Sequence, residues 1–213
     1  MDTRARRPVR GFESEQGGAA LKDWPGFHAA TAGRPTRPLF NNAWRLLDGT
    51  PGRAIDLGFG DATETVVMAR AGWSVYAVDA EPKAADRLAS LLTTEEHSRV
   101  QIVTARIEDV DLPRTDFLYA GYTLPFCRPE RFDELWARIL GSLSPRSVLA
   151  ADLFGDHDSW ASDPAMTFVS ESRLAELLRP LDIVTFEVED APGDSFIGPK
   201  HWHVFHIVAR SRR

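Results

Sequence analysis

The sequence contains a single cysteine, Cys127, among its 213 residues. One thiol excludes an internal disulfide bond and a metal site built from clustered cysteines, and it agrees with a reducing, cytoplasmic location. The chain also lacks an apolar run of about 18 residues, the length that a helix needs to cross a bilayer. Its arginine-rich beginning has no apolar stretch of the kind found in signal peptides. We therefore expect a cytoplasmic protein with no membrane partner.

The sequence also has fewer basic than acidic residues. The 31 acidic residues outnumber the 25 lysines and arginines, which gives a formal net charge of −6. Proteins that bind nucleic acids or anionic membranes usually present a basic surface. The balance favours a small-molecule substrate and no nucleic-acid partner. Nothing in the sequence separates a monomer from a homodimer.

The most informative segment that is present spans residues 53–82. Residues 54–57 are typical of a buried strand, and Gly58 and Gly60 allow the backbone to turn sharply and approach a ligand closely. A second strand over residues 75–78 then delivers Asp79. An acid about 20 residues beyond such glycines lies at the end of the neighbouring parallel strand, where it can accept hydrogen bonds from both ribose hydroxyls. The pattern predicts a nucleoside-binding pocket.

The third glycine of a dinucleotide-binding turn is missing. The segment reads G-x-G-x-A instead of G-x-G-x-x-G, and this disfavours a nicotinamide dinucleotide. A nicotinamide oxidoreductase is therefore a weak rival. A tight turn in an unrelated α/β protein is the plain structural alternative.

The chain shows no internal repeat and no low-complexity block. We expect residues 1–12 to be a disordered tail and residues 13–37, rich in glycine, proline and polar residues, to form an N-terminal lid. Residues 38–213 are expected to form one domain, because helix and strand patterns alternate along them. Expected helices cover residues 38–47, 63–71, 82–92, 132–143 and 171–178, and expected strands cover 54–57, 75–78, 100–104, 117–121, 147–153, 183–188 and 202–209.

Repeated strand-helix-strand units followed by two strands joined by a loop predict an α/β fold. The expected fold is a Rossmann-like, seven-stranded, mostly parallel sheet with an antiparallel last strand and helices on both faces. Ligands bind such sheets at the carboxyl ends of the strands. Residues that follow strands are therefore the candidates for a site.

The turn DLGFGDA at residues 56–62 resembles motif I, D-L-G-x-G-x-G, of the class I S-adenosylmethionine-dependent methyltransferases. Phe59 stands where a small residue is common, and Ala62 replaces the last glycine. The resemblance covers nearly the whole chain from about residue 38. It implies S-adenosylmethionine as cofactor and S-adenosylhomocysteine as product.

Residues at four successive strand ends would then bind the cofactor. The resemblance assigns the methionine portion to the glycine turn, the ribose to Asp79, and the adenine to Ile107 and Glu108, with Asp109 as a near rival for Glu108. Backbone carbonyls at residues 119–122 would face the sulfonium. The full expected set is Asp56, Gly58, Phe59, Gly60, Thr63, Asp79, Ala80, Arg106, Ile107, Glu108 and Ala120.

Looser matches point to a subfamily. Residues 122–126 (YTLPF), 153–156 (LFGD) and 198–203 (GPKHWH) are similar to bacterial small-molecule methyltransferases of the tellurite-resistance and trans-aconitate type. Such a subfamily covers unrelated acceptors, so the acceptor stays unassigned.

Methyl transfer from a sulfonium needs alignment, exclusion of water and sometimes a base. His157, in a loop on the ligand side, and Tyr122 are the catalytic candidates, although a lone loop histidine is more often a surface residue. Substrate-binding candidates are Trp24, Arg34, Phe126, Trp160 and His201. No metal site is expected, because the histidines at residues 201–206 alternate along a strand with no acid or cysteine near them in sequence.

Two other functions remain open. The same cofactor can serve non-methylating chemistry, such as intramolecular cyclisation of its aminobutyrate side chain or a cofactor-assisted cyclase reaction. A binding protein that keeps the fold without activity is less compatible with the intact Asp56, Gly58, Gly60 and Asp79.

Overall fold

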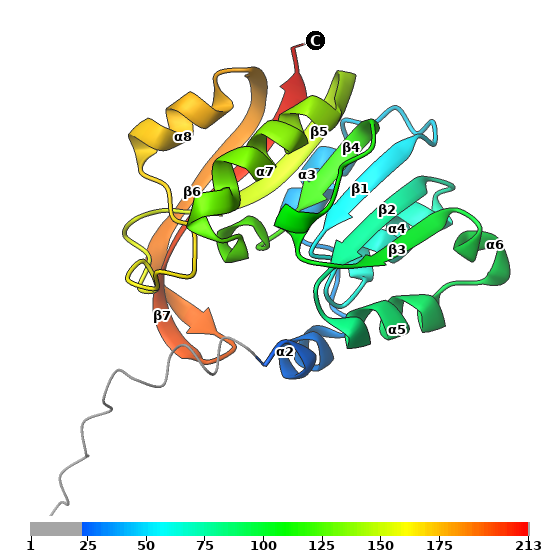
Figure 1. The fold of residues 1–213 in the computed structure, drawn as a ribbon, viewed down its shortest axis with the longest axis horizontal. Helices are drawn as coiled ribbons and strands as arrows, with labels where there is room; N and C mark the ends of the chain where they lie inside the picture. The colour runs from blue at the N-terminus through cyan, green and yellow to red at the C-terminus, as the bar shows by residue number, and fades with distance from the viewer. Residues whose placement is uncertain (1–22, 213) are drawn as a thin grey trace, which may run out of the picture.

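Strands and helices alternate along most of the chain in the computed structural model, which describes residues 23–212 (Figure 1). The strands are β1 (Arg53–Leu57), β2 (Ser74–Asp79), β3 (Val100–Thr104), β4 (Thr115–Ala120), β5 (Leu143–Phe154), β6 (Leu181–Ser195) and β7 (Gly198–Ser211). The α-helices are α2 (Trp24–Thr31), α3 (Pro38–Trp44), α4 (Thr63–Arg70), α5 (Pro82–Leu91), α6 (Thr94–His97), α7 (Pro129–Ser142) and α8 (Glu171–Leu178).

All seven strands form one sheet in the order β3-β2-β1-β4-β5-β7-β6. Neighbouring strands from β3 to β5 are parallel, whereas β7 runs antiparallel to both β5 and β6. The last strand is therefore inserted between the fifth and the sixth. This arrangement confirms the fold class predicted from the sequence.

Two hydrophobic cores cover the two faces of the sheet, because successive side chains of a strand point to opposite faces. On one face, α3, α4 and α5 pack on side chains such as Phe117 and Val148. On the other face, α7 and α8 pack on side chains such as Leu118 and Leu149. The carboxyl ends of the parallel strands are left open to a ligand.

The segment before the first strand contains a helix that the sequence analysis did not predict. Helix α2 begins after Asp23, whose side chain accepts a hydrogen bond from the Gly26 backbone N–H at 2.9 Å. It lies near the tip of the β6–β7 hairpin and near α5 (Figure 1). The expected lid, residues 13–37, is thus helical in part, and the expected tail, residues 1–12, lies outside the described residues.

Strands β6 and β7 are much longer than expected. Their antiparallel pairing continues to Ser195 and Gly198, beyond the limits of 188 and 202 that hydrophobic alternation indicates. The extension consists mostly of polar residues, glycine and proline, which give no apolar alternation. It forms a hairpin that reaches past the end of the sheet toward α2.

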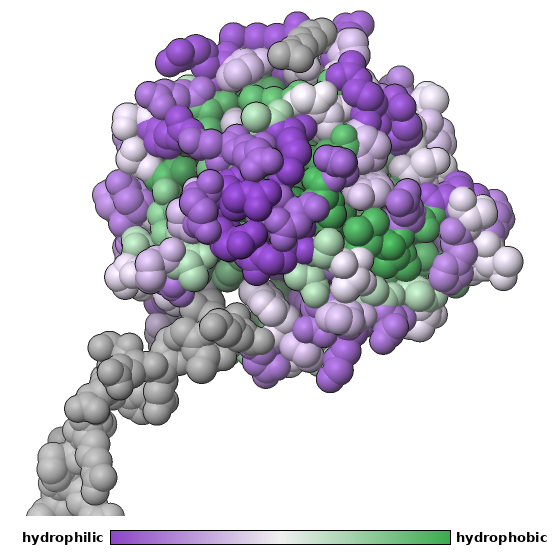
Figure 2. All heavy atoms as spheres, viewed as in Figure 1, coloured by the Kyte–Doolittle hydropathy of each residue, from purple (hydrophilic) through white to green (hydrophobic). Residues whose placement is uncertain are grey.

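The face of the molecule that carries α7 is rich in hydrophilic side chains (Figure 2). Its arginines are paired with acids: Arg128 contacts Glu108 and Asp109, and Arg131 contacts Asp109 and Glu134. Within residues 23–212, no helix combines the length and the apolar character needed to span a membrane.

Candidate active site

One cavity of about 670 Å³ lies at the carboxyl ends of the strands. At one end it is bounded by the glycine turn after β1 and by Asp79 at the end of β2. At the other end it is bounded by aromatic side chains from α2, from the segments after β4 and β5, and from the β6–β7 hairpin. Its volume is within the usual range for small-molecule sites.

The glycine turn is shaped by left-handed backbone at Gly58, Gly60 and Ala62, with φ angles of 70°, 49° and 72°. Glycine adopts this conformation freely, whereas alanine pays a modest energetic cost. A Cβ atom at Gly58 would meet the Thr123 hydroxyl at 2.1 Å, so a side chain cannot fit there. Backbone atoms without side chains therefore form this part of the cavity wall.

Asp79 braces this turn. One oxygen of its carboxylate accepts the Gly60 N–H at 2.9 Å, and the other accepts the Glu81 N–H at 2.9 Å. The side chain is buried yet lines the cavity. Because each carboxylate oxygen has a second lone pair, both can still accept a hydrogen bond from a ligand hydroxyl.

Three cavity-lining side chains carry buried polar atoms that have no hydrogen-bond partner among the described residues. They are Oδ1 of Asp56, the hydroxyl of Tyr119 and Nδ1 of His28. Burial raises the pKa of Asp56 to about 8, against the opposing effect of the 2.5 Å hydrogen bond from Thr65. Burial also lowers the pKa of His28. Buried polar groups are rarely left unpaired, so these atoms indicate where a polar ligand binds.

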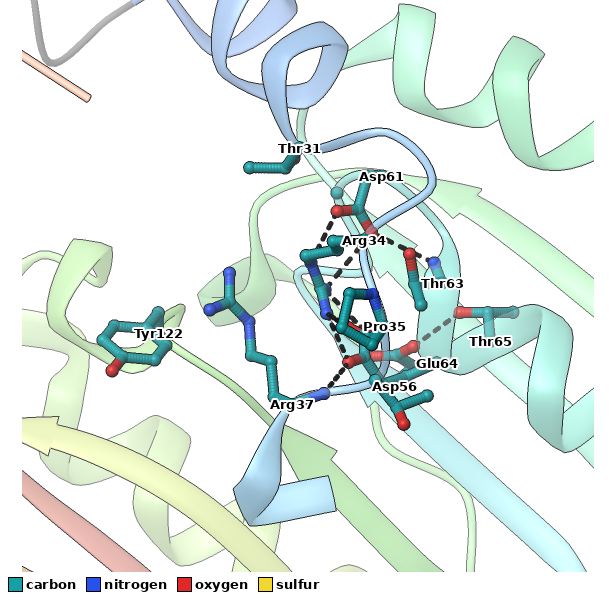
Figure 3. A network of polar contacts seen from close by, with 12 residues as sticks. Thr31, Arg34, Pro35, Arg37, Asp56, Asp61, Thr63, Glu64, Thr65 and Tyr122 are labelled. Atoms are coloured by element: carbon teal, nitrogen blue, oxygen red, sulfur yellow. Dashed lines mark hydrogen bonds and ion pairs between the residues drawn. The ribbon is translucent and has the colours of Figure 1, made fainter. Parts of the chain in front are cut away.

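Arg34 lies between Asp61 and Glu64 and uses its whole guanidinium on protein partners (Figure 3). Nε and one NH2 group contact Asp61 at 2.7 and 3.2 Å, both NH2 groups contact Glu64 at 2.7 Å, and the remaining N–H contacts the Pro35 carbonyl at 3.0 Å. All five N–H groups are occupied. This corrects the expectation that Arg34 binds substrate, although it lines the cavity.

Arg37 is the arginine that faces the ligand space instead. Its guanidinium makes no hydrogen bond or ion pair with any residue that the structure describes, and it lies 4.7 Å from the centre of the Tyr122 ring (Figure 3). Tyr122 itself has a left-handed backbone, with φ at 54°, and its N–H donates to the buried Asp152 at 3.1 Å. Burial, reinforced by Asp152, raises the pKa of the Tyr122 hydroxyl. It therefore remains protonated at neutral pH and cannot serve as a base.

A chain of charged groups links Tyr122 to the hairpin. Asp152 is fully buried and accepts a hydrogen bond from Nδ1 of His206 at 2.7 Å, while Nε2 of His206 lies 3.7 Å from Glu189. Burial alone would lower the pKa of His206, but the contact with Asp152 raises it above the ordinary value. Glu189 lines the cavity and contacts this pair through the half-buried His206.

The far end of the cavity is mostly aromatic. Trp24 of α2 meets Phe126 edge-on at 4.7 Å, and Phe27 meets Phe196 of the hairpin at 5.8 Å. His28 lies 3.2 Å from the position of a Cβ at Gly60, and its carbonyl accepts a hydrogen bond from Arg87 at 2.7 Å. Helix α2 therefore contacts both ends of the cavity.

Of the residues predicted to lie near the adenine, two line the cavity and one does not. Arg106 and Ile107 line the cavity, but Glu108 does not. One oxygen of Glu108 accepts hydrogen bonds from Arg106 at 2.7 Å and Arg128 at 3.0 Å, and the side chain is buried among arginines. The expected role of Glu108 as an adenine ligand is thus not supported by its position.

His157 and His201 also lie outside the cavity lining. Both contact the exposed Asp190, His157 through Nδ1 at 3.2 Å and His201 through Nε2 at 2.6 Å. Hydrogen bonding to Asp190 raises the pKa of His157. The position of His157 corrects its expected role as a base, because a base must reach the acceptor.

An acid does accompany these histidines, contrary to the reasoning from the sequence. Nitrogen and oxygen atoms of His157, Asp190 and His203 lie within 4.8 Å of one another. However, the rings of His157 and His203 are stacked at 4.6 Å, and Nδ1 of His203 accepts the His157 backbone N–H at 3.1 Å. A metal ion lies in the plane of each histidine ring that binds it. Because these two rings are stacked, no position within bonding distance of both lies in both ring planes, so the two rings cannot bind one ion together.

The predicted site residues as a whole fall into two groups. Those that line the cavity are Trp24, Arg34, Asp56, Gly58, Phe59, Gly60, Asp79, Ala80, Arg106, Ile107, Tyr122, Phe126 and Trp160. Those outside the lining are Thr63, Glu108, Ala120, His157 and His201. Sequence reasoning missed Glu189 and Phe196 as lining residues, and it gave residue 119 a role only through its backbone carbonyl.

Comparison with known proteins gives a consistent result. Residues 55–151 match the methyltransferase domain family. The chain is 28% identical over 162 residues to the trans-aconitate 2-methyltransferase of Mycobacterium sp. strain KMS, a match that covers 74% of this chain. The match spans 60% of that relative's length.

Solved structures share the fold. TehB from Haemophilus influenzae superposes with a TM-score of 0.67 at 16% identity, covering 83% of this chain and 62% of that protein. The 1,6-didemethyltoxoflavin-N1-methyltransferase of Burkholderia thailandensis, solved with 1,6-didemethyltoxoflavin and S-adenosylhomocysteine bound, superposes with a TM-score of 0.63 at 22% identity. That comparison covers 98% of this chain and 94% of the other. The resemblance stated from the sequence is confirmed.

Proposed function

We propose that this chain, which carries a methyltransferase domain on a Rossmann-like methyltransferase fold, transfers a methyl group from S-adenosylmethionine to a small-molecule acceptor. The observation that carries the proposal is one continuous cavity with two unlike ends. One end has the glycine turn and Asp79, and the other is a separate aromatic chamber. The second product would be S-adenosylhomocysteine.

The residues at the first end fit this cofactor. Gly58 has no room for a side chain, and Asp79 has free lone pairs toward the cavity for a ribose diol. The unpaired Oδ1 of Asp56 and the Tyr119 hydroxyl suit the ammonium and carboxylate of the methionine portion, and Arg37 adds a free guanidinium for the carboxylate. Arg106 and Ile107 would border the adenine.

The cofactor supplies an activated methyl group, so the protein has to align the acceptor and exclude water. Helix α2 closes one side of the cavity through its contacts with Phe126, Phe196 and Gly60. Tyr122 lies where the two ends of the cavity meet, and its hydroxyl stays protonated. Where the acceptor must lose a proton, Glu189 is the lining carboxylate next to the His206–Asp152 pair.

Intramolecular cyclisation of the cofactor is less compatible with this cavity. Such a reaction needs only a sealed pocket around the cofactor, whereas this cavity continues past Tyr122 to Trp160 and Trp202. The second chamber has the character of a site for a separate molecule.

Calorimetry and isotope transfer test the proposal together. We expect S-adenosylhomocysteine to bind with a micromolar or lower dissociation constant, about −8 kcal/mol, and NAD not to bind. The protein incubated with methyl-labelled cofactor and a host-cell extract should pass the label to a small molecule detected by mass spectrometry. Binding of NAD in place of S-adenosylhomocysteine, or label found only in cofactor breakdown products, would overturn the proposal.

Cofactor binding is expected to release a proton below pH 8. Because burial raises the pKa of Asp56 to about 8, the free protein holds this carboxyl mostly neutral at pH 7, and an adjacent ligand ammonium would favour its ionised form. The affinity for S-adenosylhomocysteine should therefore rise with pH toward 8 and then level off. Calorimetric titrations in buffers of different ionisation enthalpy measure the released proton, and Asp56→Asn should abolish the release.

Removal of residues 1–32 is expected to weaken binding while leaving the domain folded. The truncation removes α2 and its contacts with Phe126, Phe196 and Gly60, but it keeps Arg34 on its two acids. We expect a loss in S-adenosylhomocysteine affinity of about tenfold, or roughly 1.4 kcal/mol, with faster dissociation. Stopped-flow and thermal unfolding measure the two properties. Unchanged affinity and dissociation would show that α2 is not a lid.

A further inference from the structure

Two tryptophans and a phenylalanine form one wall of the chamber expected to hold the acceptor. Trp160, Trp202 and Phe154 all line the cavity. Their ring centres are 5.7 Å apart for the two tryptophans, and Phe154 lies 5.8 Å from Trp202 and 6.3 Å from Trp160. We call this set the aromatic wall. Taken alone, a group of rings like this suits a cationic ligand such as an alkylammonium.

The chain supplies the cation for this wall itself. Nζ of Lys200 lies 3.5 Å from the ring centre of Trp160, 3.9 Å from that of Trp202 and 4.9 Å from that of Phe154. Lys200 is buried and is not part of the cavity lining. Its ammonium therefore already makes the cation–π contacts with these rings that a ligand ammonium would make, although it does not line the cavity.

Lys200 is held in this position by a buried ion pair. Its Nζ lies 2.5 Å from Oδ1 of Asp158, and the side chain of Asp158 is fully buried. Asp158 is fixed in turn by the backbone N–H groups of Trp160 at 3.0 Å and His203 at 3.2 Å. The lysine therefore cannot swing away to admit another cation without leaving a buried charge unpaired.

Other charges around the chamber leave little net attraction for a cation. Glu189 lies 3.7 Å from His206, and the free guanidinium of Arg37 faces the same cavity across the Tyr122 ring. Asp194 is also a lining residue, but it is exposed at the tip of the hairpin. A methyl acceptor must in addition present an unprotonated lone pair, which a neighbouring cation helps to keep unprotonated.

We infer that the acceptor is a planar, uncharged aromatic or heteroaromatic molecule that stacks on the cavity side of the aromatic wall, and that Lys200 prevents the wall from binding cations. This inference rests on the proposed methyl transfer, because it assigns the second end of the same cavity. Flat rings gain from stacking on tryptophan without needing a charge.

A matched pair of probes tests the inference. Quinoline is uncharged at pH 7.5, and 1-methylquinolinium has nearly the same shape with a fixed positive charge. Equilibrium dialysis against the full-length protein saturated with S-adenosylhomocysteine should show quinoline bound at least tenfold more tightly. Equal or tighter binding of 1-methylquinolinium overturns the inference, as does failure of quinoline to bind at millimolar concentration.

A variant then assigns the selectivity to Lys200. Lys200→Met combined with Asp158→Asn removes both charges of the buried pair and keeps a side-chain oxygen that can still accept one of the two backbone hydrogen bonds. We expect the preference for quinoline to fall at least fivefold, while S-adenosylhomocysteine affinity stays unchanged. An unchanged preference in the folded variant excludes Lys200 as the cause. Failure of S-adenosylhomocysteine to bind the unmodified protein would contradict the proposed function, whereas normal cofactor binding without quinoline binding contradicts only this inference.

Discussion

Replacing Arg34 with methionine is expected to destabilise the protein by about 3–5 kcal/mol, the usual cost of removing one partner from a buried ion pair. Asp61 and Glu64 are almost fully buried, with side-chain exposures of 2% and 4%, and both depend on Arg34 for charge compensation. The Arg37 backbone N–H adds one more bond to Glu64 at 2.9 Å. Denaturation by urea, followed by circular dichroism, measures the change.

Two control variants identify the cause. Combining Arg34→Met with Asp61→Asn and Glu64→Gln removes all the charges and should recover most of the lost stability. Arg45→Met removes an exposed arginine that contacts Asn42 at 3.3 Å and should change stability by less than about 0.5 kcal/mol. A loss below about 1 kcal/mol for Arg34→Met would show that water compensates the two acids.

The same network predicts a dependence on pH. Burial works to raise the pKa of Asp61, but the Thr63 N–H and the Arg34 guanidinium outweigh it and hold that pKa below its ordinary value. A carboxyl whose pKa is lower in the folded state contributes stability above its unfolded pKa, near 3.9, and loses it as the pH falls through the folded value. The stability difference between the unmodified protein and Arg34→Met should therefore shrink below about pH 4.

The sequence was sufficient to predict the fold because the signals for it are local. The buried strands and the helices between them carry regular apolar spacing, and DLGFGDA together with Asp79 indicates the cavity end nearest the glycines. The polar hairpin extension and α2 carry weak signals, since their positions depend on contacts with distant residues. Phe27 meets Phe196, for example, across more than half of the chain.

The errors in the site have the same origin. Arg34 and Arg37 are three residues apart in a similar polar context, and only the folded chain shows that Asp61 and Glu64 take up the first and leave the second free. Glu108 follows a strand as an adenine ligand should, yet Arg106 and Arg128 bind its carboxylate. Both cases require knowledge of which charged partner lies nearby, and sequence spacing does not give it.

Replacing Asp79 with alanine is expected to weaken S-adenosylhomocysteine binding by about 1.5–3 kcal/mol, the range for hydrogen bonds to a charged group. The expected loss is therefore roughly 10- to 150-fold in the dissociation constant. The structure adds a second reason to the ribose contacts inferred from the sequence: the carboxylate also holds the Gly60 and Glu81 N–H groups, each at 2.9 Å. Alanine would remove both of these hydrogen bonds and leave the glycine turn more mobile. The turn would then have to adopt its ligand-binding conformation during binding. Calorimetry measures the affinity.

Two comparisons separate the contribution of the ribose from that of the turn. Asp79→Asn keeps one carbonyl oxygen and most of the shape, and we expect its loss to be smaller than that of alanine. Asp86→Ala removes an exposed acid from α5, the helix that follows Asp79, and should leave the affinity unchanged. If Asp79→Ala binds S-adenosylhomocysteine as well as the unmodified protein does, Asp79 is not the ribose ligand. If Asp79→Ala lowers the melting temperature without weakening binding, Asp79 only stabilises the glycine turn. The loss of its two backbone hydrogen bonds would then account for the whole effect of the substitution.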